Sequence, residues 1–381
     1  MTHRVAFIKQ PNYELNSLEK SIRSAIELSG FDLRTVSGRR VLLKPNMLGA
    51  YPPSKGVTTH PDFVLVTAKI FKEAGALVVV GDSANGVHTP ERTLAVTEIG
   101  KAVERAGVEA ISFEASGSEN RDGLMISRAP LEADIIINLP KFKTHSLTVL
   151  TLAVKNLYGC INGMQKADLH RKHQSIKEFS QVIVKIAEAV HPDLNIIDGI
   201  TAMEGNGPSG GKLKDLGCVI AGTNMHSVDA ACSKLINVDP LEIDTLQVAK
   251  NMGLWNEQDT IEITGSTLKD ISPEKFDLPS TYIKGQRGSW LFNFIMKRIW
   301  SNISAQPVID KKRCMKCYLC AKACPVSAIM YKENEIPKIK KAECIQCFCC
   351  HEICPHKAID IKSSFFIRVA KFLAERKEST H

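Results

Sequence analysis

Short apolar runs alternate with longer amphipathic stretches through the first 280 residues of the chain. Runs such as LVVVGD and IIIN are apolar without alternation, which is typical of strands covered on both faces. The pattern predicts strands at residues 5–9, 41–44, 77–81, 110–113, 135–139, 194–198, 218–221 and 261–264. Helical spacing predicts helices at residues 17–29, 61–74, 90–106, 175–189 and 227–236. This alternation predicts an α/β fold whose largely parallel sheet has helices on both faces.

The hydrophobic pattern is interrupted in ways that divide the chain. Residues 144–173 and 199–216, the latter containing EGNGPSGGK, are predicted to be long functional loops. The α/β domain is predicted at residues 1–270, followed by a linker at 271–307 and a small α+β domain at 308–362. An amphipathic helix and tail are expected at 363–381.

Two short segments combine apolar and basic residues, WLFNFIMKRIW at 290–300 and FFIRVAKFLAERK at 365–377. Each is interpreted as a helix that packs on the α/β domain or on a partner. The alternative is peripheral contact with a membrane surface. No apolar run reaches the roughly 18 to 20 residues that a transmembrane helix needs, and the N-terminus lacks the apolar core of a secretion signal. The sequence therefore predicts a cytoplasmic protein.

Nine of the 12 cysteines fall between Cys314 and Cys354. In a reducing compartment, cysteines this dense are metal ligands more often than disulfides. Charge follows the same division. Residues 285–381 contain 18 Lys and Arg and 8 Asp and Glu, a net +10, so the other 284 residues carry −2 of the total of +8. A basic excess without interleaved aromatics or a known fold signature gives no clear indication of nucleic acid binding.

The cysteines form a duplicated array. Cys314, Cys317, Cys320 and Cys324 follow the spacing C-x2-C-x2-C-x3-C-P, and the same spacing recurs thirty residues later. A zinc ribbon is the alternative interpretation, but it predicts neither the third cysteine of each array nor the trailing x3-C-P. Cys349 falls outside both arrays and is not expected to be a ligand.

Residues 308–362 resemble bacterial two-cluster ferredoxins, because both arrays and their CPVSAI and CPHKAI flanks match that pattern. The resemblance implies two 4Fe-4S clusters, with the fourth cysteine of each array binding the other cluster. Carried over by position, one cluster takes Cys314, Cys317, Cys320 and Cys354, and the other takes Cys344, Cys347, Cys350 and Cys324.

Polar residues follow several predicted strands of the α/β domain, where open α/β sheets bind their ligands. Lysines bind phosphate or carboxylate, and glycine-rich loops let backbone amides approach an anion, so we expect a small anionic substrate. The candidate catalytic residues are Lys44, Asp82, Lys141 and His145. The candidate substrate-binding residues are Asn46, His60, Asn138, Lys143, Lys155, Asn156, Asp198 and Glu204.

Structural roles are the alternatives for these residues. Lys44, Lys141 and Lys143 are then surface lysines, Asp82 and Asp198 cap turns, and His60 is an ordinary residue at a helix N-terminus. Neither a Walker A motif nor a G-x-G-x-x-G fingerprint is present, which weakens any prediction of bound ATP or NAD.

Residues 4–265 resemble the domain of unknown function 362 family. The resemblance rests on LLKPN, VTTHP, GDS, INLPKFKTH, VKNLYG and DGI with EGNGP. It implies an architecture, and many members of that family carry a ferredoxin-like tail, but it implies no particular reaction.

Three functions are compatible with this organisation. The first is a redox enzyme that delivers low-potential electrons to a small anionic substrate in the α/β crevice. The second is an electron carrier or adaptor whose α/β domain docks a partner without catalysis. The third is a non-redox enzyme or nucleic-acid-binding protein in which the clusters are structural. The first two require a protein partner that donates or accepts electrons.

Overall fold

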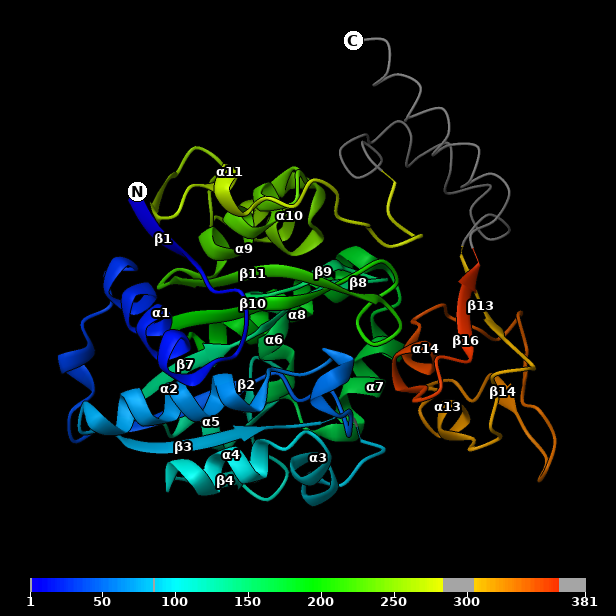
Figure 1. The fold of residues 1–381 in the computed structure, drawn as a ribbon. Coiled ribbons are helices and arrows are strands. Elements are labelled where there is room, and N and C mark those ends of the chain that lie inside the picture. Colours follow the sequence, from blue (N-terminus) through cyan, green and yellow to red (C-terminus); the bar gives the residue numbers. More distant parts are fainter. Residues whose placement is uncertain (1, 85, 284–304, 363–381) are drawn as a thin grey trace, which may run out of the picture.

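The computed structural model describes residues 2–84, 86–283 and 305–362. An α/β domain (residues 2–283) lies beside a small cysteine-rich domain (residues 305–362), drawn in orange to red in Figure 1. The helices expected at 290–300 and 365–377 lie outside the described residues. Within the described ranges, no helix combines the length and apolar character needed to cross a bilayer.

Ten strands of the described residues form one sheet. They are β1 (Thr2–Lys9), β2 (Arg40–Pro45), β3 (Leu77–Asp82), β4 (Glu109–Ser112), β7 (Ile135–Leu139), β8 (Lys141–His145), β9 (Val149–Thr151), β10 (Leu194–Glu204), β11 (Lys212–Gly222) and β12 (Thr260–Gly265). The order is β12-β1-β11-β10-β7-β2-β3-β4, and β8 pairs with both β10 and β9. The strands from β10 to β4 are parallel neighbours, whereas β11 runs antiparallel to both β1 and β10.

Helices cover both faces of this sheet (Figure 1). One face is covered by α1 (Leu15–Leu28), α2 (Pro61–Glu73) and α4 (Ile99–Ala106), and the other by α6 (Ala153–Asn156), α8 (Ile176–Val190), α9 (Met225–Leu235) and α10 (Asp244–Asn251). Strand alternation divides β2 between the two cores, with Val41 and Leu43 on one side and Leu42 on the other. The predicted α/β fold with a largely parallel sheet is confirmed.

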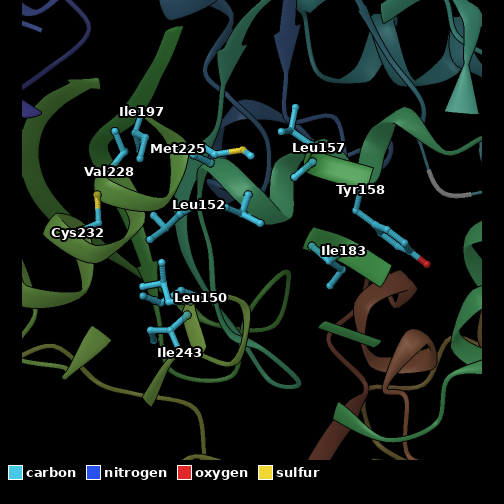
Figure 2. Packing of buried hydrophobic residues seen from close by; sticks show 14 of the residues in the cluster. Leu150, Leu152, Leu157, Tyr158, Ile183, Ile197, Met225, Val228, Cys232 and Ile243 are labelled. Atoms are coloured by element: carbon cyan, nitrogen blue, oxygen red, sulfur yellow. The ribbon is translucent and has the colours of Figure 1, made fainter. Parts of the chain in front are cut away.

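The hydrophobic core on the face covered by α6, α8, α9 and α10 also contains residues of β9, and Figure 2 shows part of it. Leu150, Leu152 and Leu157 contribute to it from a segment that the sequence analysis took for a loop. Smaller elements complete the domain: the hairpin of β5 (Ser118–Arg121) and β6 (Leu124–Ser127), and the helices α3 (Pro90–Val96), α5 (Arg128–Leu131), α7 (Gly163–Lys172) and α11 (Leu268–Ile271). Four short 3-10 helices lie at Leu33–Val36, Pro53–Lys55, Leu157–Cys160 and Pro240–Glu242.

Three local predictions are wrong. The helix expected at 90–106 is broken into α3 and α4, because Glu98 adopts a left-handed φ of 59° between them. The loop expected at 144–173 contains β9, α6 and α7, whose apolar residues are buried. The loop expected at 199–216 is mostly a β-ribbon, because β10 and β11 remain paired as far as Glu204 and Lys212. Its glycines lie chiefly in the short connection at 205–211.

The cysteine-rich domain is a small α+β unit, as the sequence predicts. Its elements are β13 (Gln306–Ile309), α13 (Leu319–Lys322), β14 (Ile329–Met330), β15 (Lys338–Ile339), α14 (Cys349–Ile353) and β16 (Ile359–Lys362). β13 pairs antiparallel with β16, and β14 pairs antiparallel with β15. β13 therefore begins within the segment expected to be a linker.

The cysteine-rich domain is held against the α/β domain around α14. The backbone oxygen of Glu352 accepts hydrogen bonds from the Tyr51 hydroxyl at 2.5 Å and the Ser209 hydroxyl at 2.7 Å. His351 Nε2 lies 3.0 Å from the backbone oxygen of Asn206, which is on the connection between β10 and β11. The Lys357 ammonium donates to the oxygen of Gly211 at 2.9 Å. The end of this β-ribbon therefore forms much of the contact between the two domains.

A methyl group at Gly210 is expected to weaken this contact between the two domains. A Cβ there would lie 2.5 Å from His351 Nε2 and 3.1 Å from the oxygen of Asn206, so G210A forces the two domains apart. Overpacking of this kind costs about 1–3 kcal/mol. We expect faster hydrogen–deuterium exchange in α14 and around Tyr51, measured by mass spectrometry.

The matched control is G100A in α4, where the nearest atom to the new Cβ is 3.4 Å away. It should leave exchange at α14 unchanged. Identical exchange in G210A and G100A would show that Gly210 does not set the domain contact.

Candidate functional site

Two small cavities in the cysteine-rich domain are each lined by four cysteines. The first is lined by Cys314, Cys317, Cys320 and Cys354. The second is lined by Cys324, Cys344, Cys347 and Cys350. Each set combines three cysteines of one array with the last cysteine of the other. The structure thus brings together the same two sets of four that the sequence resemblance implies.

Thiolates are the ligands of iron–sulfur clusters, and four cysteines line each small cavity. Within the described residues, no group of three or more His, Cys, Asp or Glu side chains could hold one metal ion. Backbone N–H groups of Ala328 and Ala358 each donate to a cysteine sulfur, Cys324 and Cys354 respectively, at 3.2 Å. Such bonds stabilise negative charge on cluster sulfurs.

The duplication extends to the backbone. Lys316 and Gln346 have φ values of 55° and 57°, and Tyr318 and Phe348 have values of 60° and 61°. These left-handed turns fall at equivalent places in the two arrays and curl each chain segment around its cavity. Cys349 lines neither of the two small cavities, but a larger one between the domains.

This interdomain cavity has a volume of about 130 Å³. The α/β domain supplies one wall, and the cysteine-rich domain supplies the other through Lys322, Ala323, Cys349, Glu352 and Ile353. The cationic, imidazole and carboxylate side chains of its lining are the lysines Lys143, Lys155, Lys166 and Lys322, the imidazoles His145 and His170, and the acids Asp82 and Glu352. Lysines therefore outnumber carboxylates in the lining.

A chain of amides fixes the floor of the cavity. Lys143 Nζ donates to Asn46 Oδ1 at 2.7 Å, Asn46 Nδ2 donates to Asn156 Oδ1 at 2.7 Å, and Asn156 Nδ2 donates to Asn138 Oδ1 at 2.8 Å. Asn138 in turn donates to Asn195 Oδ1 at 2.8 Å. Because each amide uses its oxygen and its nitrogen, the orientation of every member is determined by the next. This network connects the ends of β2, β7 and β10 with α6.

The cavity lysines differ in how many partners they have. Lys166 donates to the backbone oxygens of Ser83 and Ala84 and to the Ser83 hydroxyl, so its three N–H groups are all used. Lys143 also donates to the oxygen of Val57, at 2.7 Å, and retains one N–H. Burial lowers the pKa of Lys143 to about 7 and that of Lys166 to about 8.

Lys155 of the α/β wall has aromatic rings as the partners of its ammonium. Its ammonium lies 4.5 Å from the ring centre of Tyr158 and 5.7 Å from that of Phe179. In the described part of the chain, no oxygen accepts a hydrogen bond from it. Burial lowers its pKa, opposed by the charge of Glu352. Figure 2 shows Tyr158 at one end of the buried cluster, with its hydroxyl directed away from the aliphatic side chains. An ammonium held only by aromatic faces is available to an incoming anion.

His145 connects the cavity floor to the opposite wall. Its Nδ1 accepts hydrogen bonds from the backbone N–H groups of Leu147 and Thr148, at 3.1 and 3.3 Å. The proton of the neutral ring is therefore on Nε2, which lies 3.2 Å from Glu352 Oε1. Burial lowers the pKa of His145. Burial alone would raise the pKa of Glu352, but His145 and Lys155 lower it to about 2.

Lys44 and Asp82 form an ion pair directly below the cavity. Lys44 Nζ lies 2.7 Å from Asp82 Oδ1, and both side chains are at most 3% exposed. The other oxygen of Asp82 accepts the N–H of Met47 at 2.8 Å, which positions the chain after β2. Gly159 packs on this pair, because a Cβ there would overlap Asp82 Oδ1 and lie 2.6 Å from Lys44 Nζ.

A second polar cluster lies away from the cavity lining. Lys141 Nζ donates to Asp198 Oδ2 at 2.7 Å and to the Tyr13 hydroxyl at 2.8 Å, and that hydroxyl donates to Asp198 Oδ1 at 2.9 Å. Burial and the charge of Asp198 raise the pKa of Tyr13. His60 stacks on the Tyr13 ring and accepts the N–H of Asp62 as the N-cap of α2, which is the structural role considered for it.

The structure thus places six of the twelve predicted α/β residues in the cavity wall: Asn46, Asp82, Lys143, His145, Lys155 and Asn156. The other six, Lys44, His60, Asn138, Lys141, Asp198 and Glu204, lie outside that lining. Lys44 and Asn138 support it through Asp82 and Asn156. Lys44, Lys141 and Lys143 are buried, so they are not surface lysines. Glu204 instead accepts the N–H of Asp277 at 3.0 Å.

Sequence reasoning missed the cavity residues that come from unexpected elements. Tyr158, Lys166 and His170 belong to the segment that was expected to be a loop. Glu352 and Cys349 come from the other domain. The signal for Lys166 and His170 was their spacing of four, which places both on one side of a helix.

Fold and site together define an α/β protein with an attached iron–sulfur domain. A family model described as 4Fe-4S dicluster domain matches residues 306–364, so the cysteine-rich domain is a 4Fe-4S ferredoxin-type domain. The chain belongs to the family described as Domain of unknown function (DUF362), whose model matches residues 41–234.

Two individual proteins show the range of similarity. The thylakoid-associated protein sll1697 of Synechocystis sp. is 33% identical over 265 residues, which are 67% of this chain and 81% of that protein. The lactate racemase apoprotein of Thermoanaerobacterium thermosaccharolyticum is similar in structure with a TM-score of 0.41 and 12% sequence identity. That match covers 61% of this chain and 57% of the racemase chain.

Removal of Lys44 is expected to destabilise the α/β domain because it leaves Asp82 buried without its cation. Breaking a buried ion pair in this way costs about 3–5 kcal/mol. Replacing both charges, in K44M/D82N, should recover most of that loss, since the asparagine side chain that replaces Asp82 retains an oxygen for the N–H of Met47. The measurement is urea unfolding of the full chain followed by circular dichroism. A double variant no more stable than K44M would contradict this account of the pair.

Proposed function

We propose that this protein is a redox enzyme in which two 4Fe-4S clusters deliver low-potential electrons to a small anionic substrate bound in the interdomain cavity. The observation that carries the proposal is the position of the cavity. One wall contains unpaired or partly paired lysines, and the other contains residues adjacent in sequence to the cysteines of both small cavities. Cys349 lies between Cys347 and Cys350, Ala323 precedes Cys324, and Ile353 precedes Cys354.

The two sets of four cysteines are the ligands of the two clusters in this proposal. Cubane clusters supply single electrons at potentials that depend on hydrogen bonds and solvent exposure. The apolar residues Ile329, Phe348 and Ile359 line the two cavities and limit access of water to them.

The α/β residues have separable roles in binding and protonation. Lys155 anchors the anion, because its ammonium has no competing oxygen acceptor in the described residues and faces the cavity. Lys143 offers the substrate its remaining N–H, and with a pKa of about 7 it can also donate a proton when the substrate is reduced. Lys166 and the amide chain hold the cavity shape. His145 and Glu352 hold the two walls together.

The alternative of a carrier or adaptor fits this geometry less well. A docking α/β domain would present the carboxyl ends of its strands to a partner. In this structure those ends already face the cysteine-rich domain of the same chain. A cavity between the electron donor and the sheet favours a small molecule as the acceptor.

The proposal is tested with protein purified and reduced without oxygen. Small carboxylates and phosphates are screened for their ability to reoxidise the clusters, followed by the return of visible absorbance. For any anion that does so, K155M should lower kcat/KM by about 10- to 100-fold, because a hydrogen bond between charged groups contributes about 1.5–3 kcal/mol. Electron paramagnetic resonance should show the same two reduced clusters in K155M and in the wild type.

The matched control is K185M, which removes an exposed lysine of α8 and should leave turnover unchanged. Equal activity of K155M and the wild type would contradict the role of Lys155. Absence of any reducible iron–sulfur signal in the wild type would contradict the redox function itself.

A further inference from the structure

The two halves of the duplicated cysteine-rich domain differ in their exposure. Met315 is 67% exposed, whereas its counterpart Ile345 is half-buried, and Tyr318 is half-buried whereas Phe348 is only 5% exposed. Among the 12 cysteines of the chain, Cys317 alone is exposed. The first cysteine-lined cavity therefore has an exposed cysteine, whereas Cys324, Cys344 and Cys347 of the second are half-buried.

We call the exposed and half-buried residues beside Cys317, with the segment that packs on Tyr318, the entry patch: Met315, Tyr318, Met330, Tyr331, Lys316 and Lys332. The Tyr318 and Tyr331 rings stack with centroids 4.5 Å apart, and the Tyr318 hydroxyl donates to the oxygen of Lys332 at 3.1 Å. Met330 and Tyr331 are each 49% exposed. Large apolar side chains at the edge of a cysteine-lined cavity are typical of an interaction surface.

The entry patch and the interdomain cavity are separate parts of the surface of the cysteine-rich domain. No residue of the entry patch lines the interdomain cavity. Met315, Cys317 and Tyr318 line the first small cavity, whereas Cys349, which lines the interdomain cavity, is flanked by two cysteines of the second. Ile353 also lines the interdomain cavity and directly precedes Cys354 of the first set, so both sets of cysteines adjoin that cavity. Electrons that arrive at the entry patch would enter at the first set.

Charge indicates what kind of partner fits the patch. The described residues 305–362 contain 11 Lys and Arg and 6 Asp and Glu, a net +5, and two clusters of charge −2 each, counted with their four thiolates, leave +1. Residues 1–284 carry −2. Among the described residues, Lys311, Lys312, Lys316 and Lys332 form no ion pair with a carboxylate, and all four are exposed. These four lysines attract negatively charged proteins to the cysteine-rich domain.

We propose that the entry patch is the docking surface for a small acidic electron-transfer protein. The partner loses one electron in each encounter, and the cluster held by Cys314, Cys317, Cys320 and Cys354 gains it, with no bond made or broken. The apolar side chains bring the two redox centres close, and the lysines orient the partner. This inference rests on the clusters of the proposed function. It adds the surface at which electrons enter them.

The first test measures binding alone. The probe is an acidic flavodoxin in its oxidised form, titrated by calorimetry at low ionic strength into anaerobic protein with full iron content. K316E/K332E should bind at least about tenfold more weakly than the wild type, and the wild-type affinity should fall as salt is added. K69E/K101E is the matched control, because it reverses two exposed lysines on α2 and α4. Equal weakening in both double variants, or no weakening in either, would overturn the proposal.

The second test measures electron transfer. Flavodoxin hydroquinone is mixed with oxidised protein in a stopped-flow instrument, and the second-order rate should fall at least about tenfold in K316E/K332E. Dithionite should still reduce the clusters of that variant completely. If dithionite reduces no cluster in the wild type, the proposed function fails and this inference fails with it. If dithionite reduces both proteins and flavodoxin reduces them at equal rates, only this inference fails.

Anionic lipid is the other negatively charged surface that lysines and methionines could meet. Vesicles containing phosphatidylglycerol are therefore tested by flotation with the same variants. Membrane binding that is lost in K316E/K332E while flavodoxin affinity is unchanged would overturn the proposal. Flavodoxin affinity lost in that variant, with equal flotation of all proteins, supports it.

Discussion

The contact between α14 and the carboxyl ends of the sheet is the interaction on which the site depends. The backbone oxygen of Glu352 accepts bonds from two α/β hydroxyls, and its carboxylate lies 3.2 Å from His145 Nε2. These bonds place a helix that carries Cys350, one of the four cysteines of the second small cavity, over a cavity lined by lysines. Without the contact, the cavity is an open crevice and the clusters are remote from it. The contact therefore makes one site from two domains.

Buried lysines impose a second constraint, because removing an ammonium from water costs several kcal/mol unless other groups compensate. Compensation is complete for Lys44 and Lys141, which pair with Asp82 and Asp198. It is partial for Lys143, which has two oxygen acceptors. Lys155 has only aromatic faces. The lysines outside the lining, Lys44 and Lys141, are thus fully paired, whereas the lysines that line the cavity, Lys143 and Lys155, have fewer partners. A bound anion would supply the missing partner.

The sequence was most informative where chemistry is local. The resemblance of the cysteine arrays to two-cluster ferredoxins implies two sets of four, and the structure places the same eight cysteines around two cavities. Asn46 and Asp82 could also be predicted as site residues, because each lies at the carboxyl end of a strand and parallel strands end at one edge of the sheet. The contribution of α7 to the lining could not be predicted in the same way, because the residues of this helix are mostly polar. Glu352 was beyond reach for another reason: its place depends on how two domains dock, which no local pattern encodes.

Crystallography at the iron absorption edge, on crystals grown without oxygen, tests the central claim most directly. The account predicts two anomalous peaks, each of four iron atoms, one within Cys314, Cys317, Cys320 and Cys354 and the other within Cys324, Cys344, Cys347 and Cys350. It also predicts that the second set lies beside a cavity shared with Lys155. Single-atom peaks among the cysteines, or two domains that share no cavity, would contradict it.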